Sequence, residues 1–196
     1  MIKATNTTFK YPNSDKIVFP DFSVANGAGL LITGESGCGK TTLLHILAGL
    51  RKPLSGEIII DNQDITQLPS SKLDQFRGQH IGIVYQQPYF IESLSIMDNL
   101  ILSPFTSDKK KVIKIAKRLN IGELLHRLPS QLSVGQKQRA SIARAVMNQP
   151  KLILADEPTS ALDNKNSRQV TSLLAEEAKA NNAALIVVTH DDRVRS

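Results

Sequence analysis

The sequence predicts an α/β fold built around a mainly parallel sheet, and two observations carry that prediction. Short segments that are apolar on consecutive residues recur along the chain, which is typical of strands buried on both faces of a parallel sheet. Stretches with helical spacing of apolar residues lie between them, as in folds that alternate strand and helix. Residues 87–130 interrupt this alternation and look mostly helical, so we expect an inserted helical subdomain there.

The elements follow in order from the N-terminus. Residues 2–24 form two extended pieces around a turn-forming run at residues 11–15, which predicts an N-terminal antiparallel β piece. Buried strands of the parallel type are expected at residues 30–33, 57–60, 81–85, 152–155 and 184–189. Helices are expected near residues 40–50, 70–79, 109–127, 134–148 and 165–181.

Composition narrows the class of protein. With 196 residues, of which 41% are hydrophobic, the chain is long enough for one domain with a sizeable core. No apolar run approaches the roughly 18–20 residues of a membrane-spanning helix, and no secretory signal opens the chain. A single cysteine excludes an internal disulfide and fits a reducing cytosol. The net charge of +6 suits nucleic acid, an anionic membrane surface or a bound triphosphate, so charge alone identifies no partner.

The run Gly-Glu-Ser-Gly-Cys-Gly-Lys-Thr at residues 34–41 matches G-x-x-x-x-G-K-[ST] between a predicted strand and a predicted helix. Glycines let successive backbone N–H groups turn toward phosphate oxygens, and the helix N-terminus adds partial positive charge. Lys40 supplies a charge for the outer phosphates, and the Thr41 hydroxyl suits Mg²⁺. The sequence therefore predicts a nucleoside triphosphate site formed by Gly34, Glu35, Ser36, Gly37, Cys38, Gly39, Lys40, Thr41 and Thr42.

Two adjacent carboxylates, Asp156 and Glu157, follow the buried strand at residues 152–155. A single aspartate at such a place is often a helix cap, but two ionised groups require a partner or a cation. Consecutive strand side chains point to opposite sides, so the two acids can divide two roles. We expect Asp156 to help hold Mg²⁺ and Glu157 to face the water that attacks the triphosphate.

The segment Leu-Ser-Val-Gly-Gln at residues 132–136 precedes a helix rich in small and apolar residues. It is the third of five motifs that follow one another in order: the loop at 34–41, a glutamine after the strand at 81–85, residues 132–136, the Asp156-Glu157 pair, and the run Thr-His-Asp at 189–191. In these motifs, and over essentially its whole length, the chain resembles the nucleotide-binding subunits of ATP-binding cassette (ABC) transporters. The resemblance implies the three-layer fold of P-loop NTPases.

The resemblance also implies roles for single residues. Tyr11 would stack on adenine, with a tyrosine that only supports a turn as the alternative. Gln86, in preference to Gln87, would sense Mg²⁺ and the attacking water, and His190 would contact the γ-phosphate. Residues lent to the ATP site of an opposite subunit would be Ser133, Gly135 and Gln136. The implied catalytic set is Glu157, His190 and Gln86, and the implied Mg²⁺ set is Thr41, Gln86 and Asp156.

Two features depart from the family pattern. Val134 stands where a glycine is usual, and a β-branched residue does not reach positive φ cheaply. The change is mild if residue 134 is helical and impairs this half of the site otherwise. The chain also stops six residues after His190, where the family normally continues with a strand and closing helices. We therefore expect a less covered sheet surface, and with it modest stability or dependence on a partner.

The resemblance implies an ATPase subunit that powers transport through a membrane permease, and residues 73–86 and 93–100 resemble the lipoprotein-release and macrolide-export branch. The implied cofactors are ATP and Mg²⁺. The implied partners are the permease and a second cassette, either another copy or a homologue, and no nucleic acid. The implied location is cytoplasmic, peripheral on the inner face of the cell membrane. A non-transport ABC ATPase that regulates a membrane or division complex is the alternative.

The expected domain organisation is a single ABC ATPase domain over residues 1–196. Residues 1–86 and 150–196 would form the nucleotide-binding core, and residues 87–149 the helical subdomain with the 132–136 segment. Apolar residues within 87–105 either grip the permease or fill the subdomain core. The lysine-rich helix that begins at residue 109 is either a solvated face or a surface attracted to anionic headgroups.

Overall fold

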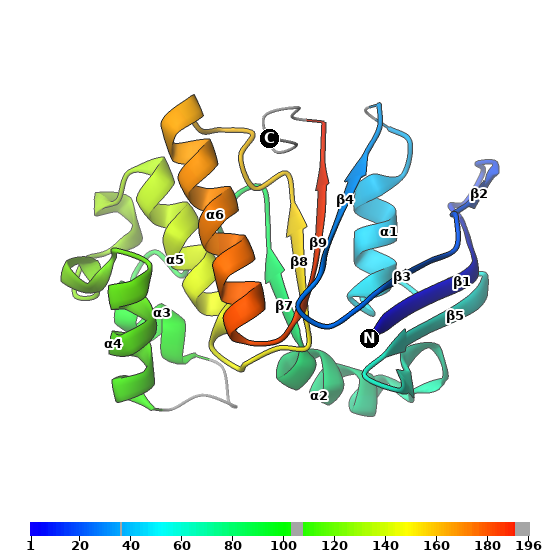
Figure 1. Cartoon of the computed structure of the whole chain (residues 1–196), viewed down its shortest axis with the longest axis horizontal. Helices are drawn as coiled ribbons and strands as arrows, with labels where there is room; N and C mark the ends of the chain where they lie inside the picture. The colour runs from blue at the N-terminus through cyan, green and yellow to red at the C-terminus, as the bar shows by residue number, and fades with distance from the viewer. Residues whose placement is uncertain (36, 103–107, 191–196) are drawn as a thin grey trace.

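The computed structural model describes residues 1–35, 37–102 and 108–190, which form two sheets with helices between and beside them (Figure 1). The first sheet is antiparallel and comes from the N-terminal part of the chain. Its order is β2-β1-β5-β6, and β3 also pairs with β1. The strands are β1 (Ile2–Lys10), β2 (Lys16–Val18), β3 (Phe22–Val24), β5 (Ser55–Ile60) and β6 (Gln63–Asp64).

The second sheet is parallel throughout, with the order β4-β9-β8-β7. Its strands are β4 (Gly29–Thr33), β7 (Ile81–Val84), β8 (Leu152–Asp156) and β9 (Ala184–Thr189). Every residue of β8 and β9 is buried, which explains why their sequences are apolar without alternation. Because the four strands run the same way, their carboxyl ends meet along one edge, where ligands of open α/β sheets usually bind.

Helices cover both faces of the parallel sheet (Figure 1). α1 (Lys40–Leu47) packs in one core cluster with residues of the antiparallel sheet and of β8 and β9, so it lies between the two sheets. α5 (Val134–Val146) and α6 (Asn164–Ala180) cover the other face and share a second cluster with these strands. Adjacent strand residues divide between the clusters, with Ile153 of β8 in the second and Leu154 in the first.

The remaining helices lie toward the ends of the parallel sheet. α2 (Ser70–His80) leads directly into β7. α3 (Ile96–Ile101) and α4 (Lys109–Arg118) pack with α5 at the far end of the molecule from the antiparallel sheet (Figure 1). Short 3₁₀ turns connect these elements at Ile65–Gln67, Gly122–Leu124 and Pro129–Gln131.

The prediction that residues 57–60 form a strand of the parallel sheet is wrong. These residues belong to β5, which pairs antiparallel with β1. Ile58 and Ile60 are buried in the cluster around α1, whereas Ile59 is only half-buried. One face of β5 therefore lies in the core, and a short apolar run reports burial without reporting the direction of the neighbouring strand.

The prediction of one helix over residues 109–127 is too long. α4 ends at Arg118, and Asn120 has a φ of 54°, in the left-handed region where helices commonly end. A separate 3₁₀ turn follows at Gly122–Leu124. At the N-terminus the structure has three strands where two extended pieces were expected, because β2 and β3 pair with opposite ends of β1.

The predicted fold class is confirmed: a parallel sheet with helices on both faces lies beside an N-terminal antiparallel sheet. The helices of the described ranges include none that is both long and apolar enough to cross a bilayer.

Candidate nucleotide site

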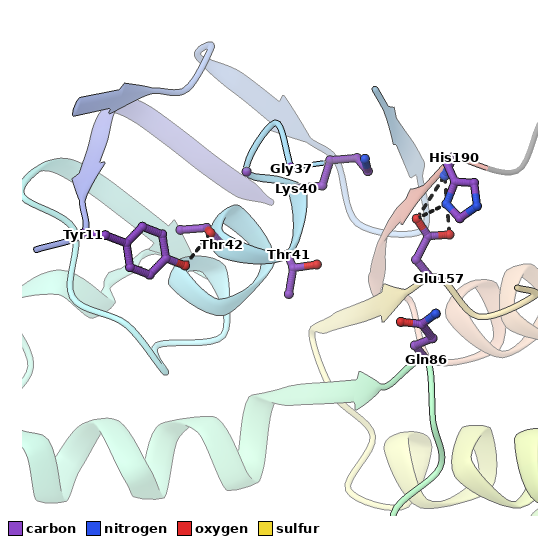
Figure 2. A pocket seen from close by; sticks show the side chains of 9 residues that line it. Tyr11, Gly37, Lys40, Thr41, Thr42, Gln86, Glu157 and His190 are labelled. Carbon is purple, nitrogen blue, oxygen red and sulfur yellow. Dashed lines mark hydrogen bonds and ion pairs between the residues drawn. The ribbon is translucent and has the colours of Figure 1, made fainter. Parts of the chain in front are cut away.

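The loop between β4 and α1 forms one wall of the candidate site (Figure 2). Gly37 and Gly39 have φ values of 84° and 98°, in the left-handed region that glycine adopts without steric cost. Gly39 is the N-cap of α1 and has no side chain to cap the helix, so the first N–H groups of α1 remain available as donors. A turn of backbone donors that opens a helix is an arrangement that binds phosphate.

Lys40 is the first residue of α1, and its side chain reaches back to the loop that precedes the helix. Its Nζ donates to the carbonyl oxygens of Gly34 and Glu35 at 2.8 Å each. The same nitrogen lies 3.9 Å from Sγ of Cys38, an exposed thiol. The positive charge is thus held beside the phosphate loop, while the predicted site residue Ser36 lies outside the described residues.

Thr41 and Asp156 meet although they are far apart in the sequence. Thr41 Oγ1 donates to Asp156 Oδ1 at 3.3 Å, which joins the start of α1 to the end of β8. Asp156 is only 8% exposed, and this burial raises the pKa of its carboxyl above the ordinary value, although the hydrogen bond from Thr41 lowers it. A buried carboxylate next to a hydroxyl offers oxygen atoms, which are the ligands that Mg²⁺ prefers.

The residues present fit a magnesium ion that is held largely by substrate phosphates. Thr41 and Gln86 line the same pocket. Asp156 does not line it but accepts a hydrogen bond from the Thr41 hydroxyl. Across the described ranges, no group of three or more His, Cys, Asp and Glu side chains is placed to hold a metal alone. That pattern suits Mg²⁺, which usually keeps several waters and binds one or two protein groups together with phosphates.

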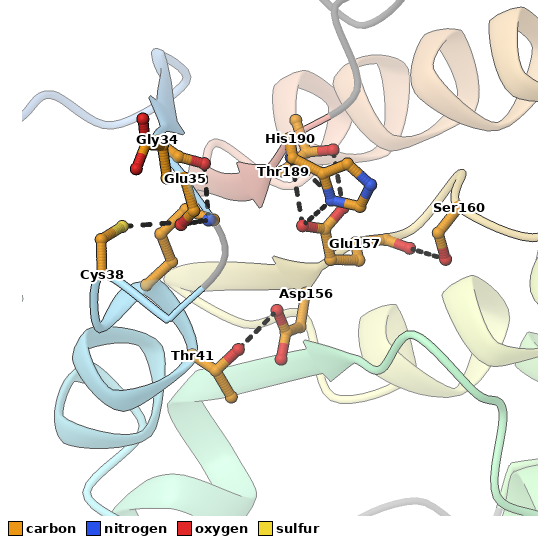
Figure 3. Close-up of polar contacts among 10 residues, drawn as sticks. Gly34, Glu35, Cys38, Thr41, Asp156, Glu157, Ser160, Thr189 and His190 are labelled. Carbon is orange, nitrogen blue, oxygen red and sulfur yellow. Dashed lines mark hydrogen bonds and ion pairs between the residues drawn. The ribbon is translucent and has the colours of Figure 1, made fainter.

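Glu157 has a φ of 46°, a left-handed conformation that is uncommon for a residue with a side chain. Its carboxylate is held by the end of β9 (Figure 3). Thr189 Oγ1 donates to Oε2 at 2.9 Å, and the backbone N–H of His190 donates to Oε1 at 3.1 Å. Nδ1 of the exposed His190 ring lies 2.7 Å from Oε1. Such strain persists where surrounding bonds over-determine it, and it often marks functional sites.

The two adjacent acids therefore have different partners. Asp156 turns toward Thr41 at the start of α1, whereas Glu157 turns toward the end of β9 (Figure 3). Glu157 follows the last residue of β8 and has a left-handed backbone, so the bend after the strand, rather than strand alternation alone, sets the direction of its side chain.

Tyr11 lies at the opposite rim of the pocket from Glu157 (Figure 2). Its hydroxyl oxygen is 2.8 Å from Oγ1 of Thr42, and its ring makes an edge contact with Phe9, with 4.9 Å between ring centroids. The guanidinium of Arg51 lies 5.1 Å from the centroid of the Tyr11 ring, within the range of a cation–π contact. These three contacts set the orientation of the ring at the edge of the pocket.

The pocket has a volume of about 580 Å³, within the range typical of small-molecule sites. Its lining comes from five separate parts of the chain, and every lining residue is one that the sequence singled out. These residues are Tyr11, Gly37, Gly39, Lys40, Thr41, Thr42, Gln86, Glu157 and His190.

The predicted residues of the 132–136 segment do not line this pocket. Ser133 caps α5: its hydroxyl accepts from the N–H of Gln136 at 3.3 Å, and Gln136 Oε1 accepts from the N–H of Ser133 at 2.8 Å. Gly135 is buried, and a Cβ there would lie 3.2 Å from Oδ1 of Asn166 on α6. The segment thus forms a locally closed N-terminus of α5, with Ser133 exposed.

Val134 is the first residue of α5 and is 53% exposed. Its φ is not positive, so the β-branched side chain causes no backbone strain. Residue 134 is therefore helical, which is the condition under which the Val134 departure is expected to be mild.

Sequence reasoning missed two partners of the predicted residues. Thr189 was noted only as part of a motif, although its hydroxyl holds Glu157. Its place beside His190 at the end of a buried strand was the available signal. Nothing in the sequence around Arg51 indicated a role in the site, because Arg51 and Tyr11 are distant in the chain and meet only in the folded structure.

The chain is similar to solved ATP-binding cassettes. A dimeric post-hydrolysis structure of the ATP-binding cassette MJ0796 bound to ADP and Pi has a TM-score of 0.87 and 34% identity, over 99% of this chain and 90% of that one. The structure of cbiO1 from Clostridium perfringens, part of the ABC transporter complex cbiONQ, has a TM-score of 0.87 and 29% identity, over 97% of this chain and 78% of that one.

Curated sequences point the same way. The lipoprotein-releasing system ATP-binding protein LolD of Shewanella frigidimarina is 39% identical, over 89% of this chain and 75% of that protein. Its counterpart in Treponema denticola is 34% identical, over 100% of this chain and 90% of that protein. The expected resemblance to the lipoprotein-release branch is therefore confirmed. The ABC transporter family model matches residues 20–160. The chain belongs to the ABC transporter family, in which it is an ABC ATPase, the ATP-binding cassette subunit.

Proposed function

We propose that this cassette binds ATP with Mg²⁺ in the pocket at the carboxyl edge of the parallel sheet, and that hydrolysis there drives transport through a separate permease. The single observation that carries the proposal is the composition of that pocket. Backbone donors of the phosphate loop and Lys40 at the start of α1 lie on one side, and Glu157, whose backbone is left-handed, lies across the pocket from Tyr11. These are the parts that ATP hydrolysis requires.

The chemistry follows from the geometry, because hydrolysis of a phosphoanhydride is mainly a matter of positioning and charge stabilisation. Loop N–H groups and Lys40 would bind the phosphate oxygens. Thr41, Asp156 and Gln86 would hold Mg²⁺, which when bound neutralises phosphate charge. Glu157 would accept a proton from the attacking water, a role typically worth about 10²–10⁴ in rate.

The proposed site is completed by a second cassette, which contributes Ser133, Gly135 and Gln136. Two observations support this. The three residues do not line the pocket of their own chain, and they open α5, whose N-terminus attracts anions. A dimeric structure of MJ0796 shows that a related cassette pairs. ATP would then join two chains and its hydrolysis would release them, because the nucleotide binds the closed state better.

The permease, and a position on the cytoplasmic face of the membrane, are also part of the proposal. Related proteins named LolD are the ATP-binding proteins of lipoprotein-releasing systems, which makes lipid-anchored proteins the proposed class of cargo. Tyr89, Ile91 and Leu102 are exposed apolar residues near α3, and we assign them to the permease contact. Residues 1–86 and 150–196 would form the nucleotide-binding core, with residues 87–149 as the helical subdomain.

A mixture of two inactive variants tests the shared site. Lys40→Ala removes phosphate binding in its own pocket, whereas Ser133→Arg leaves that pocket unchanged and alters the exposed residue offered to the partner, together with the cap of α5. Each variant alone should lose ATP hydrolysis. An equimolar mixture should recover up to about a quarter of the wild-type rate, because about half of the dimers are mixed and each mixed dimer has one intact site.

The matched control carries both substitutions in one chain. Mixed with either single variant, it forms no intact site, so no activity should return. The shared site is refuted if Ser133→Arg alone hydrolyses ATP at the wild-type rate, or if the mixture stays inactive although mixed dimers form. Co-purification of the wild type with a division complex instead of a permease would favour the non-transport alternative.

A further inference from the structure

The excess positive charge of the chain is concentrated on one helix. The chain has 24 basic and 18 acidic residues. α4 reads KKKVIKIAKR, with six basic residues and no acidic one. Outside α4, basic and acidic residues are therefore equally numerous. No residue of α4 lines the nucleotide pocket, so this charge does not serve the triphosphate.

α4 presents its lysines to solvent because its apolar residues are held on the other side. Val112, Ile115 and Ala116 are buried in the cluster that α4 shares with α3 and α5. The lysines at 110, 114 and 117 recur at intervals of four and three residues, which keeps them along one side of the helix. We define the lysine face as the exposed residues Lys109, Lys110, Lys114 and Lys117.

The lysine face is not neutralised by its surroundings. Arg118, on the same helix, binds the buried Glu177 of α6 through two hydrogen bonds of 2.8 and 2.6 Å, so its charge is balanced. The nearby Asp108 caps α4 by accepting from the backbone N–H of Lys110. None of the four lysines forms an ion pair with any residue that the structure describes. An anionic partner would therefore be attracted to the lysine face.

An apolar residue within the lysine face indicates which anion fits. Ile113 is 39% exposed and lies one helical turn from Lys109, Lys110 and Lys117. An exposed isoleucine has no apolar surface to pack against in water or on a phosphodiester backbone. At a lipid surface it enters below the headgroups, while flexible lysine stems reach up to the phosphates.

We propose that the lysine face of α4 binds the anionic headgroups of a phospholipid membrane. The inference rests on the proposed function, because the permease would bring the cassette to a bilayer. α4 contacts α3, which ends beside the exposed Leu102 of the proposed permease contact. Docking on the permease through Leu102 would therefore bring α4 close to the bilayer around the permease. Each lysine near an anionic surface strengthens binding by about fivefold.

Binding of the full chain to vesicles tests the proposal. Vesicles of phosphatidylcholine alone are compared with vesicles that also contain phosphatidylglycerol. The wild type should sediment with the anionic vesicles, less so as salt rises. A variant with Lys→Gln at all four positions of the lysine face should bind them at least about a hundredfold more weakly.

A matched control removes the same number of charges elsewhere. Exposed lysines on four other elements are changed to glutamine: Lys3, Lys16, Lys72 and Lys165. This control should keep most of the vesicle affinity, and circular dichroism should show both variants folded. The proposal is overturned if the lysine-face variant binds like the wild type, if the control loses as much affinity, or if phosphatidylcholine alone is bound equally well.

Ile113→Gln separates lipid from other polyanions. It should weaken vesicle binding a few-fold, whereas Leu54→Gln, at an exposed leucine on another part of the surface, should not. A single-stranded oligonucleotide that binds as tightly as the vesicles, with no effect of Ile113→Gln on either, would replace the membrane by a general polyanion. If the wild type hydrolyses ATP normally but does not bind vesicles, the membrane inference is refuted and the proposed function is not. Absent hydrolysis in the wild type refutes the proposed function.

Discussion

The pocket and the segment at residues 132–136 belong to the same proposed site, but they are held in place in different ways. The pocket depends on bonds between distant elements, such as Thr41 to Asp156 and Thr189 to Glu157. The segment is closed by its own capping box, between Ser133 and Gln136. The chemistry therefore requires the assembled sheet edge, whereas the surface offered to a partner requires only a well-capped helix.

Because of this difference, a single substitution should affect ATP hydrolysis in a different way in each of the two regions. Substitutions in the pocket should stop chemistry while leaving the partner surface intact. Substitutions in the 132–136 segment should act through the partner's site. The four variants below test that division, from the largest expected effect to the smallest.

Glu157→Gln should lower the ATP hydrolysis rate by about 10²–10⁴, because an amide cannot accept the proton of the attacking water. ATP binding should survive, since Lys40 and the loop are unchanged, and ATP-bound dimers should accumulate. The measurement is hydrolysis beside nucleotide binding and size-exclusion chromatography with ATP. Turnover at the wild-type rate would remove Glu157 from the mechanism.

Asp156→Asn should lower Mg²⁺-dependent hydrolysis by about a hundredfold or more, since one charged oxygen ligand is lost. Without Mg²⁺ and nucleotide, the same variant should melt at or slightly above the wild-type temperature, because it removes a buried carboxylate. Loss of thermal stability at neutral pH would show instead that the carboxylate supports the fold.

The pH dependence of this stability has a definite sign. Burial raises the pKa of Asp156 in the folded chain above its value in the unfolded chain. The folded state therefore binds more protons, and its stability falls as pH rises from the ordinary pKa of an aspartate, about 3.9, through the raised one. In thermal melts without Mg²⁺, the difference between wild type and Asp156→Asn should shrink toward acidic pH.

Thr189→Val should lower the maximal hydrolysis rate about tenfold, with little change in the KM for ATP. The buried hydroxyl holds Glu157 Oε2 at 2.9 Å, and valine matches threonine in shape without offering that bond. Thr189→Ser, which retains the hydroxyl, should restore most of the rate. An equal loss in both variants would point to packing at the end of β9 rather than to positioning of Glu157.

Val134→Gly should change the hydrolysis rate by no more than about twofold, because residue 134 is already helical and exposed. Glycine is a poorer helix former than valine by roughly 0.3–0.5 kcal/mol, so the melting temperature should drop only slightly. A large gain in hydrolysis would mean that valine impairs the surface offered to the partner.

The phosphate loop and the buried strands were predictable from the sequence because local rules govern them. Glycine spacing reports a loop that must adopt positive φ, as Gly37 and Gly39 do. Unbroken apolar runs report burial on both faces, as in β8 and β9. The run at residues 57–60 shows where local reasoning ends, since its partner strand could be chosen only by the rest of the chain.

By itself, the sequence determined which groups this ATPase would use: a phosphate loop, two acids after a strand, a histidine and a capped helix start. Only the tertiary structure decided how they meet. It gave Glu157 its strained backbone and its partners Thr189 and His190, set Arg51 beside Tyr11, and paired Arg118 of α4 with the buried Glu177. The physical reason is that conformational preference acts between neighbours in the chain, whereas charge, burial and hydrogen bonding act between neighbours in space.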